Sequence, residues 1–203
     1  MRQADRWRRA LTVATVVSAI AVAGCTDGDP GDGPTATLAT SMSPTPSPSP
    51  TVDLTRLPEK PAAMSEPTTD GAIAAATYML DLYTYAFVTG DTAPWRALAA
   101  STCEFCSGVV EGVDELAAAG HASTGGPFRV QDSRAVEVTE SEWFSVDLVA
   151  VQEPSRRVDA EGATVADNPG GSFRVVYALS WNDGWRVDEM GFERVDATES
   201  PDA

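Results

Sequence analysis

Apolar residues recur three or four positions apart in the first half of the folded region and predict a long helix. The pattern covers residues 70–89, with Asp70 as the N-cap and Gly90 as the residue that ends the helix. One face of this helix is apolar and suited to packing against a sheet. The apolar positions are Ile73, Ala76, Leu80, Tyr83 and Phe87.

Two further helices are predicted before the pattern changes. Pro94 suits the first turn of a short helix that runs to about Ala100. A third helix is predicted over residues 102–119, where Gly120 ends it. Its apolar face consists of Phe105, Val109, Val113 and Leu116.

After Gly126 the apolar period changes from 3.6 to 2, which predicts strands. Residues 128–138 and 144–150 alternate between apolar and polar side chains. Asp132 and Arg134 interrupt the first of these patterns and indicate a bulge or a bend. Residues 158–165 are weakly strand-like and are interpreted as either an edge strand or a loop.

The last two strands are predicted to form a hairpin around residues 182–184. A three-residue loop with Gly184 in the left-handed conformation places Trp181 opposite Trp185, whereas a two-residue turn mixes the two faces. The three-residue loop also places Leu179 opposite Val187. Helices followed by a long-stranded meander predict an α+β domain, with the N-terminal helices packed on a curved antiparallel sheet.

The N-terminus has the features of an export signal. Four arginines precede an uncharged run over residues 10–24, which is shorter than the roughly 20 residues that span a bilayer. Val22-Ala23-Gly24-Cys25 resembles the bacterial lipobox, in which the cysteine is acylated after cleavage. We therefore predict a lipoprotein signal peptide over 1–24 and lipidation of Cys25. The alternative is an ordinary signal peptide cleaved after Ala23, which leaves Cys25 unmodified.

Composition divides the rest of the chain into three parts. Residues 25–64 are rich in Ser, Thr, Pro and Gly and are predicted to be a disordered linker, because they bury too little apolar surface to offset their ordering entropy. The folded domain is predicted over 65–195 and an acidic disordered tail over 196–203.

Charge excludes one class of partner. The chain has 14 Lys and Arg against 30 Asp and Glu, a formal net charge of −16. A nucleic-acid-binding surface needs a basic patch to neutralise phosphates, so no nucleic-acid partner is expected. Anionic head groups repel this domain, and the expected membrane contact is the acylated Cys25 alone.

The order of elements and the final hairpin resemble the NTF2-like cone fold. Five short segments also resemble an actinobacterial lipoprotein family of unknown function. The resemblance implies an architecture and a location on the cell surface, and it assigns no catalytic residue. The segments are Pro58-Glu59-Lys60-Pro61, Gly71-Ala72, Tyr83 with Tyr85-Ala86, Thr89-Gly90-Asp91 and the CE-x-C motif Cys103-Glu104-Phe105-Cys106.

Cys103 and Cys106 remain as an even pair once Cys25 is acylated. Within the first turn of a helix, residues three apart share a face and lie within disulfide reach, so a structural disulfide is predicted. A thioredoxin-like redox pair is the alternative, since this spacing at a helix N-terminus lowers a thiolate pKa. No metal site is predicted, because the single histidine, His121, does not complete a zinc ligand set.

Five aromatic residues are the candidates for lining a cone pocket, and core packing is the alternative for each. Tyr177 and Trp181 are the first choices, because the face of their strand is the clearest. No catalytic residue and no cofactor are predicted, since His121 and the strand carboxylates have no identified partner. The five candidates are Tyr78, Trp143, Tyr177, Trp181 and Trp185.

These patterns favour a membrane-anchored, extracytoplasmic lipoprotein that acts as a non-catalytic binding or interaction module. Its expected partner is a small apolar ligand or an extracytoplasmic protein, and a homodimer is left open. A small-molecule enzyme of the SnoaL or ketosteroid-isomerase type is the alternative, on the analogy of fold. An extracellular thiol–disulfide redox protein using Cys103 and Cys106 is the third.

Overall fold

The computed structural model describes residues 52–195. The predicted signal peptide over 1–24, the predicted lipidation site Cys25, the part of the predicted linker before residue 52 and the predicted tail over 196–203 lie outside the described residues. The described part is an α+β domain with two antiparallel sheets. No helix within 52–195 has the length and apolar character needed to cross a membrane. The elements are η1 (Ala62–Ser65), α1 (Thr69–Thr89), α2 (Ala93–Leu98), α3 (Glu104–Ala118), β1 (Ala122–Gly125), β2 (Phe128–Thr139), β3 (Trp143–Gln152), β4 (Ser155–Val158), β5 (Thr164–Asn168), β6 (Gly171–Trp181) and β7 (Trp185–Arg194).

The long helix α1 begins slightly earlier than predicted. Thr68, and not Asp70, is its N-cap, because the Thr68 hydroxyl accepts a hydrogen bond from the Gly71 amide at 3.0 Å. Asp70 instead lies in the first turn, where a negative charge favours the helix dipole. The predicted end is confirmed: Gly90 is the C-cap, with φ of 79°.

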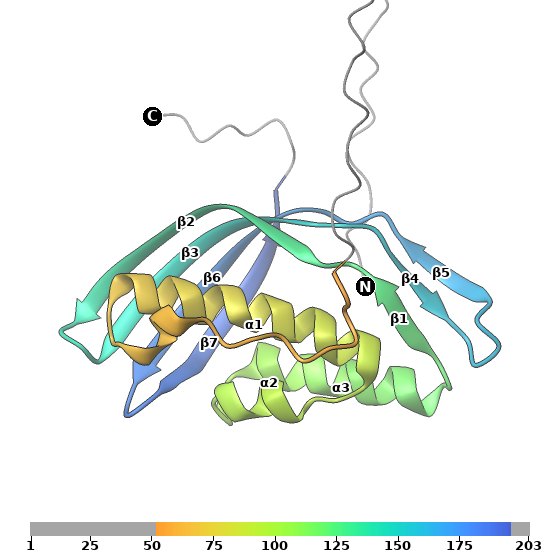
Figure 1. Ribbon diagram of the computed structural model, residues 1–203, viewed down its shortest axis with the longest axis horizontal. Coiled ribbons are helices and arrows are strands. Elements are labelled where there is room, and N and C mark those ends of the chain that lie inside the picture. The colour runs from red at the N-terminus through yellow and green to blue at the C-terminus, as the bar shows by residue number, and fades with distance from the viewer. Residues whose placement is uncertain (1–51, 196–203) are drawn as a thin grey trace, which may run out of the picture. The chain divides into compact units, whose positions relative to one another are not determined.

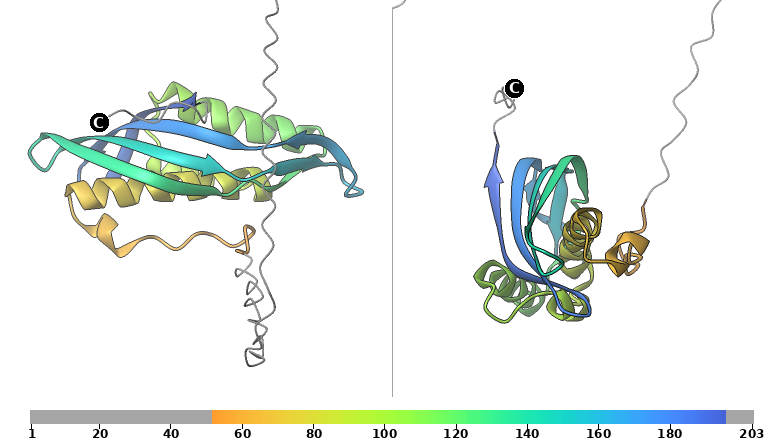
Figure 2. Two further views of the ribbon diagram at one scale, coloured as in Figure 1. Left: turned by 90° about the horizontal axis from the view of Figure 1, so that it is seen from above. Right: turned by 90° about the vertical axis from the view of Figure 1, so that its left-hand side faces the viewer.

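The large sheet has the order β2-β3-β6-β7 and its inner face forms the core with the helices. Figures 1 and 2 show the strands arching over α1, α2 and α3. The predicted irregularity of the first long strand is confirmed by a register shift between Val130 and Asp132. The inner face is almost completely buried at Phe144, Val146, Leu148, Ala150, Val175, Tyr177, Leu179 and Val187.

The predicted register of the last hairpin is confirmed: Trp181 pairs with Trp185 and Leu179 with Val187. The residue with a positive φ is Asp183, at 54°, and not Gly184 as predicted. Aspartate tolerates the left-handed region better than most residues. The Gly184 carbonyl is turned so that it accepts a hydrogen bond from the Asn182 amide at 3.0 Å.

The small sheet, with the order β1-β4-β5, was not expected as a separate unit. The strand β1 was missed, and residues 158–165 are neither a single edge strand nor a loop. They contain the turn between β4 and β5, which the Asp159 carboxylate closes by accepting hydrogen bonds from the Glu161 and Ala163 amides. Every residue of β5 is exposed, so burial imposes no apolar alternation on its sequence.

Each strand of the small sheet continues along the chain into or out of a strand of the large sheet. The three junctions are residues 126–127, 153–154 and 169–170, and each contains a proline or a glycine. Gly170 has φ of 76°, and a Cβ there would overlap the backbone carbonyl of Gln152. Glycine and proline therefore interrupt all three strands at one level and separate one curved sheet into two.

The predicted end of the linker at residue 64 lies too late in the chain. Met64 is 2% exposed and belongs to the core, and the preceding residues lie along α1. The Tyr78 hydroxyl donates a hydrogen bond to the Pro58 carbonyl at 3.5 Å. Apolar burial therefore begins within a stretch whose prolines and small polar residues predict a linker.

Candidate functional site

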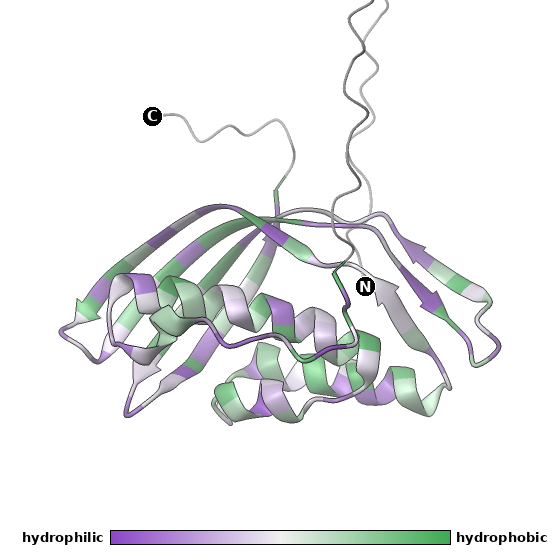
Figure 3. Ribbon diagram, viewed as in Figure 1, coloured by the Kyte–Doolittle hydropathy of each residue, from purple (hydrophilic) through white to green (hydrophobic). Residues whose placement is uncertain are grey.

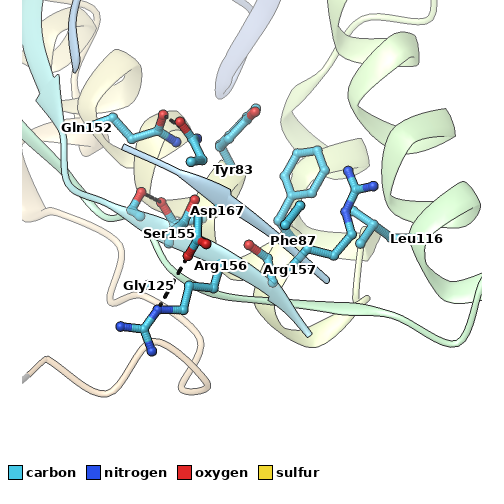
Figure 4. Close-up of a pocket in the computed structure, with 14 residues that line it drawn as sticks. Tyr83, Phe87, Leu116, Gly125, Gln152, Ser155, Arg156, Arg157 and Asp167 are labelled. Carbon is cyan, nitrogen blue, oxygen red and sulfur yellow. Dashed lines mark hydrogen bonds and ion pairs between the residues drawn. The ribbon is translucent and has the colours of Figure 1, made fainter. Parts of the chain in front are cut away.

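The inner face of the small sheet forms one wall of a pocket of about 280 Å³. Strand pairing places Ser123, Arg157 and Ala166 in one row across the three strands. Gly125, Ser155 and Asn168 form the next row on the same face. All six residues line the pocket, which Figure 4 shows in close-up. These two rows therefore consist of small and polar side chains with one cation, Arg157, at the middle strand. Arg156 and Asp167 of the alternate row also line the pocket.

The opposite wall of the pocket is apolar and comes from α1 and α3. Tyr83 and Phe87 lie one turn apart on α1 with their ring centroids 4.7 Å apart. Phe87 lies above Gly112 of α3, where a Cβ would approach its ring to 3.5 Å. Leu116 lies one turn further along α3 and also lines the pocket. Burial raises the pKa of Tyr83, so its hydroxyl stays neutral at physiological pH.

Hydrogen bonds hold the polar groups at the bend between the sheets. The buried Thr84 hydroxyl of α1 donates to the Gly126 carbonyl at 3.3 Å. The Asn168 side chain donates to the Gln152 amide oxygen at 3.5 Å and accepts from the Gly170 amide at 3.0 Å. These bonds connect α1 to the junction between β1 and β2, and β5 to β3, at the edge of the pocket, so the bend positions the site.

The two neighbouring arginines of β4 have different electrostatic surroundings. Arg156 lies in the alternate row, opposite Asp167, and its guanidinium is 3.8 Å from that carboxylate. Within residues 52–195, no carboxylate lies within 4.0 Å of the Arg157 guanidinium. Figure 4 shows the two guanidinium groups pointing in different directions. Arg157 therefore contributes the net positive charge of the pocket.

A second pocket, of about 620 Å³, lies between α1 and the segment over 52–59. Asp81 lines this pocket and keeps contact with solvent. Partial desolvation of its carboxyl group by the surrounding protein raises the pKa of Asp81 to about 6. Burial, and then the Asp81 charge, raise the pKa of both Tyr78 and Tyr177. Thr84 lines both pockets and lies between them.

The five aromatic candidates lie elsewhere and line neither of these pockets. Tyr78, Tyr177 and Trp185 are buried in the core, and Trp181 packs edge-on to Trp185 at 5.1 Å. Trp143 is 41% exposed, because strand alternation turns it away from the face that carries its buried neighbour Phe144. The four candidates other than Trp143 pack in or against the core that the large sheet shares with the helices, so they fill the space in which the sequence predicts a cavity.

Cys103 and Cys106 form a disulfide with their Cα atoms 5.2 Å apart. Cys103 is the N-cap of α3 and not a first-turn residue, because its sulfur accepts a hydrogen bond from the Cys106 amide. Both cysteines are almost fully buried, and the Trp95 indole donates to the Cys106 carbonyl at 3.0 Å. Burial restricts attack on the sulfur atoms and supports a structural role over redox chemistry.

The strand carboxylates Asp147 and Asp188 lie on β3 and β7, and neither lines the two pockets described above. Asp147 pairs with Arg174 on the outer face of the large sheet. Asp188 pairs with Arg186 at 3.1 Å within β7. His121 lies between α3 and β1 and lines neither pocket. The structure therefore does not bring His121 together with these carboxylates in either pocket.

Sequence reasoning missed the pocket residues, although two signals for them exist. Arg156-Arg157 is the only adjacent pair of basic residues after Arg8-Arg9 in a strongly acidic chain. Glycine and proline also recur at 125–127, 154 and 169–171, which are the positions where the strands break. Together they mark a polar, bent region. Only the strand pairing shows that the breaks coincide in space.

A comparison with solved structures agrees with this architecture. The domain is similar in fold to a solved structure titled "Crystal structure of intermembrane space region of chloroplast protein ARC6", with a TM-score of 0.50 and 11% sequence identity. The similarity covers 63% of this chain and 98% of that one. The chain belongs to the DUF6318 family, a family of unknown function, whose model matches residues 55–191. No curated protein sequence matches the chain.

Proposed function

We propose that this protein is a lipoprotein anchored through acylated Cys25 on the extracytoplasmic face of the membrane, and that its domain is a non-catalytic binding module. The N-terminal arginines, the uncharged run and Val22-Ala23-Gly24-Cys25 support the anchor. The arch of antiparallel strands over three helices supports an NTF2-like cone.

One observation carries the binding role: a polar, accessible sheet face lies beside an apolar helical wall. A face that served stability alone would gain from apolar side chains and a cover. Here β5 is exposed along its whole length, and the hydropathy colouring of Figure 3 shows hydrophilic stretches on β4 and β5. Mixed polar and apolar walls around a small pocket are typical of ligand sites.

The chemistry of the lining groups favours binding over catalysis. Arg157 offers a cationic fork of N–H donors, and the Ser123, Ser155 and Asn168 side chains are uncharged. Such groups donate and accept hydrogen bonds without changing protonation state. They therefore recognise a ligand and do not transfer its protons.

The anchor is tested by replacing Cys25 with Ser in cells that carry the full chain. We expect palmitate label and membrane retention in the natural protein and the loss of both in Cys25→Ser. External protease acting on intact spheroplasts should remove the domain, because it lies outside the membrane. Retention of the Cys25→Ser protein on membranes would contradict the lipid anchor.

The pocket is tested with two matched substitutions in one sheet. Ala166→Phe fills the pocket from its inner face, and Thr124→Phe adds the same ring to the opposite face. Fluorine NMR of the detergent-solubilised full-length protein, with a mixture of neutral, anionic and cationic fragments, reports binding as line broadening. We expect Ala166→Phe to abolish the broadening and Thr124→Phe to retain it. Equal broadening in both variants means that the fragments bind elsewhere.

A second candidate function rests on Asp81. A carboxylate with a pKa near 6 beside a pocket is suited to general-base catalysis, as in an enzyme of the SnoaL or ketosteroid-isomerase type. Proton abstraction predicts deuterium incorporation beside the carbonyl group of a cyclic ketone in heavy water. The activity should disappear in Asp81→Asn and persist in Ala166→Phe, which separates the two pockets. No incorporation above the buffer rate contradicts this candidate.

A further inference from the structure

We infer that the pocket between the small sheet and helices α1 and α3 selects a small organic carboxylate that carries a compact apolar or aromatic group. This inference rests on the proposed binding role and names the ligand class. Arg157 binds the carboxylate, and Phe87 with Leu116 contacts the apolar group. The following observations support each part.

The position of Arg157 makes its guanidinium available to a ligand. Arg157 occupies the middle strand, and its two neighbours in the row are Ser123 and Ala166. Both neighbours are too short to cover the arginine side chain, and neither carries a charge. The planar guanidinium presents a fork of N–H donors that matches the two oxygens of a carboxylate.

The adjacent charges do not neutralise Arg157. Asp167 is the one carboxylate among the described residues that line the pocket, and it lies opposite Arg156. Those two charges compensate each other, and one positive charge remains. The chain as a whole carries −16 and repels anions, but exposed charges beyond about 8 Å are largely screened at physiological ionic strength. The local cation therefore decides the sign inside the pocket.

The size and the second wall of the pocket define the rest of the ligand. A volume of about 280 Å³ lies just below the range of about 300–1,000 Å³ for small-molecule sites, so the ligand must be small. Phe87 and Leu116 offer contact area to a ring or a short branched chain. The hydroxyls of Ser123 and Ser155 lie on the same wall as Arg157 and can donate to carboxylate oxygens. A carboxylate and an apolar group are therefore recognised by opposite walls.

The test uses three fluorinated probes that separate the contribution of the negative charge to binding from that of the aromatic ring. Para-fluorobenzoate has both features, para-fluorobenzamide keeps the ring without the charge, and fluoroacetate keeps the charge without the ring. Fluorine NMR titrations of the detergent-solubilised full-length protein give the affinity of each probe. We expect fluorobenzoate to bind at least about tenfold more tightly than either of the others. The affinities of the two anionic probes should fall at high salt, whereas that of fluorobenzamide should not.

Matched variants assign the effect to one arginine. Arg157→Gln should weaken fluorobenzoate binding by about tenfold or more. Arg156→Gln combined with Asp167→Asn removes the neighbouring ion pair without changing the net charge of the pocket, and it should leave the affinity within about twofold. Arg157→Lys should restore part of the affinity, because it keeps the charge and loses the fork. Equal effects of Arg157→Gln and of the combined Arg156→Gln and Asp167→Asn variant would overturn the inference, as would no effect of either.

The outcomes also distinguish this inference from the proposed function. If fluorobenzamide binds as tightly as fluorobenzoate and Ala166→Phe removes both, the pocket is a binding site and the selection for carboxylates is wrong. If none of the three probes binds while other fragments still depend on Ala166, the ligand class is also wrong. If nothing in the fragment mixture depends on Ala166, the binding role itself fails.

Discussion

The two sheets of this domain use their inner faces in opposite ways. In the large sheet the inner face carries Phe144, Leu148 and Val175, which are at most 1% exposed. In the small sheet the same face carries Ser123, Arg157 and Ala166, and the whole of β5 is exposed. Apolar burial stabilises the first face, whereas strand continuity with the large sheet supports the second. The difference separates the part that holds the fold from the part that is free to bind.

The strongest test of this comparison removes packing from the large sheet. Leu148→Ala should lower the free energy of unfolding by about 3–5 kcal/mol, because the side chain is fully buried in the core. Urea unfolding followed by circular dichroism measures the change. Ala166→Ser on the small sheet is the control and should change stability by less than about 0.5 kcal/mol. Similar losses in the two variants would show that both sheets contribute to one core.

The second test acts on the bend between the sheets. Gly170→Ala should lower the free energy of unfolding by about 2–3 kcal/mol, since alanine is strained at a positive φ and its Cβ meets the Gln152 backbone. Gly162 also has a positive φ, of 83°, but has open space around it. Gly162→Ala therefore measures the strain alone. If both variants lose the same stability, the close approach at the bend does not matter.

The third test concerns the disulfide that begins α3. Replacing both cysteines by serine should cost about 2 kcal/mol or less, because a cross-link over so short a loop constrains little chain entropy. Serine at position 103 can still cap the helix, so Cys103→Ala with Cys106→Ser should cost about 1 kcal/mol more. Thermal unfolding by calorimetry measures both values. A loss of the fold in the double serine variant would contradict this order.

The fourth test is the pH dependence contributed by Asp81. Its pKa is about 6 in the folded protein and 3.8 for the ordinary carboxyl, so the folded state holds the proton more tightly. The contribution of Asp81 to the stability of the folded state is fully present below about pH 4 and is lost as the pH rises through 6. Asp81→Asn should therefore be more stable than the natural protein at pH 7, by about 1 kcal/mol at most, because solvent contact screens the effect.

The measurement is the difference in unfolding free energy between the two proteins at several pH values. The difference should shrink as the pH falls from 7 to 4. Taking the difference removes the contribution of the other carboxylates, which is common to both proteins. A difference that does not vary with pH would exclude the raised pKa.

The smallest expected effect on stability is that of the proposed binding residue. Arg157→Gln should change the free energy of unfolding by less than about 0.5 kcal/mol, since the side chain is exposed and has no carboxylate partner within the described residues. Chemical unfolding at neutral pH checks it. A large loss would mean that Arg157 supports the fold. Stability and binding would then not be divided between the two sheets.

Much of the large sheet and the helices follows from local patterns. The period of α1, its end at Gly90 and the pairing of Trp181 with Trp185 were all predicted, because one buried face dictates apolar positions along each element. The small sheet was not predicted as a unit. Strand β5 is exposed, and the half-buried positions of β1 and β4 carry mostly small or polar residues, so these strands show no apolar alternation that a sequence can reveal.

The candidate pocket shows the same limit. Tyr177 and Trp185 were expected to line a cavity, because aromatic residues on a clear face mark an interior. Whether an interior is filled or hollow depends on the volumes of the side chains that the packed helices and strands place there. In this domain the helices fill the space against those rings, and the hollow lies at the bend near Arg157.

The sequence by itself determined the helices, the long strands, the last hairpin and the even pair of cysteines, since each depends on neighbours close in the chain. Only the tertiary structure decided that three separate breaks at glycine and proline lie at one level and divide the sheet. It also decided that Arg156 meets Asp167 while Arg157 faces the pocket. Such relations depend on strand pairing between distant residues, and local periodicity carries no information about them.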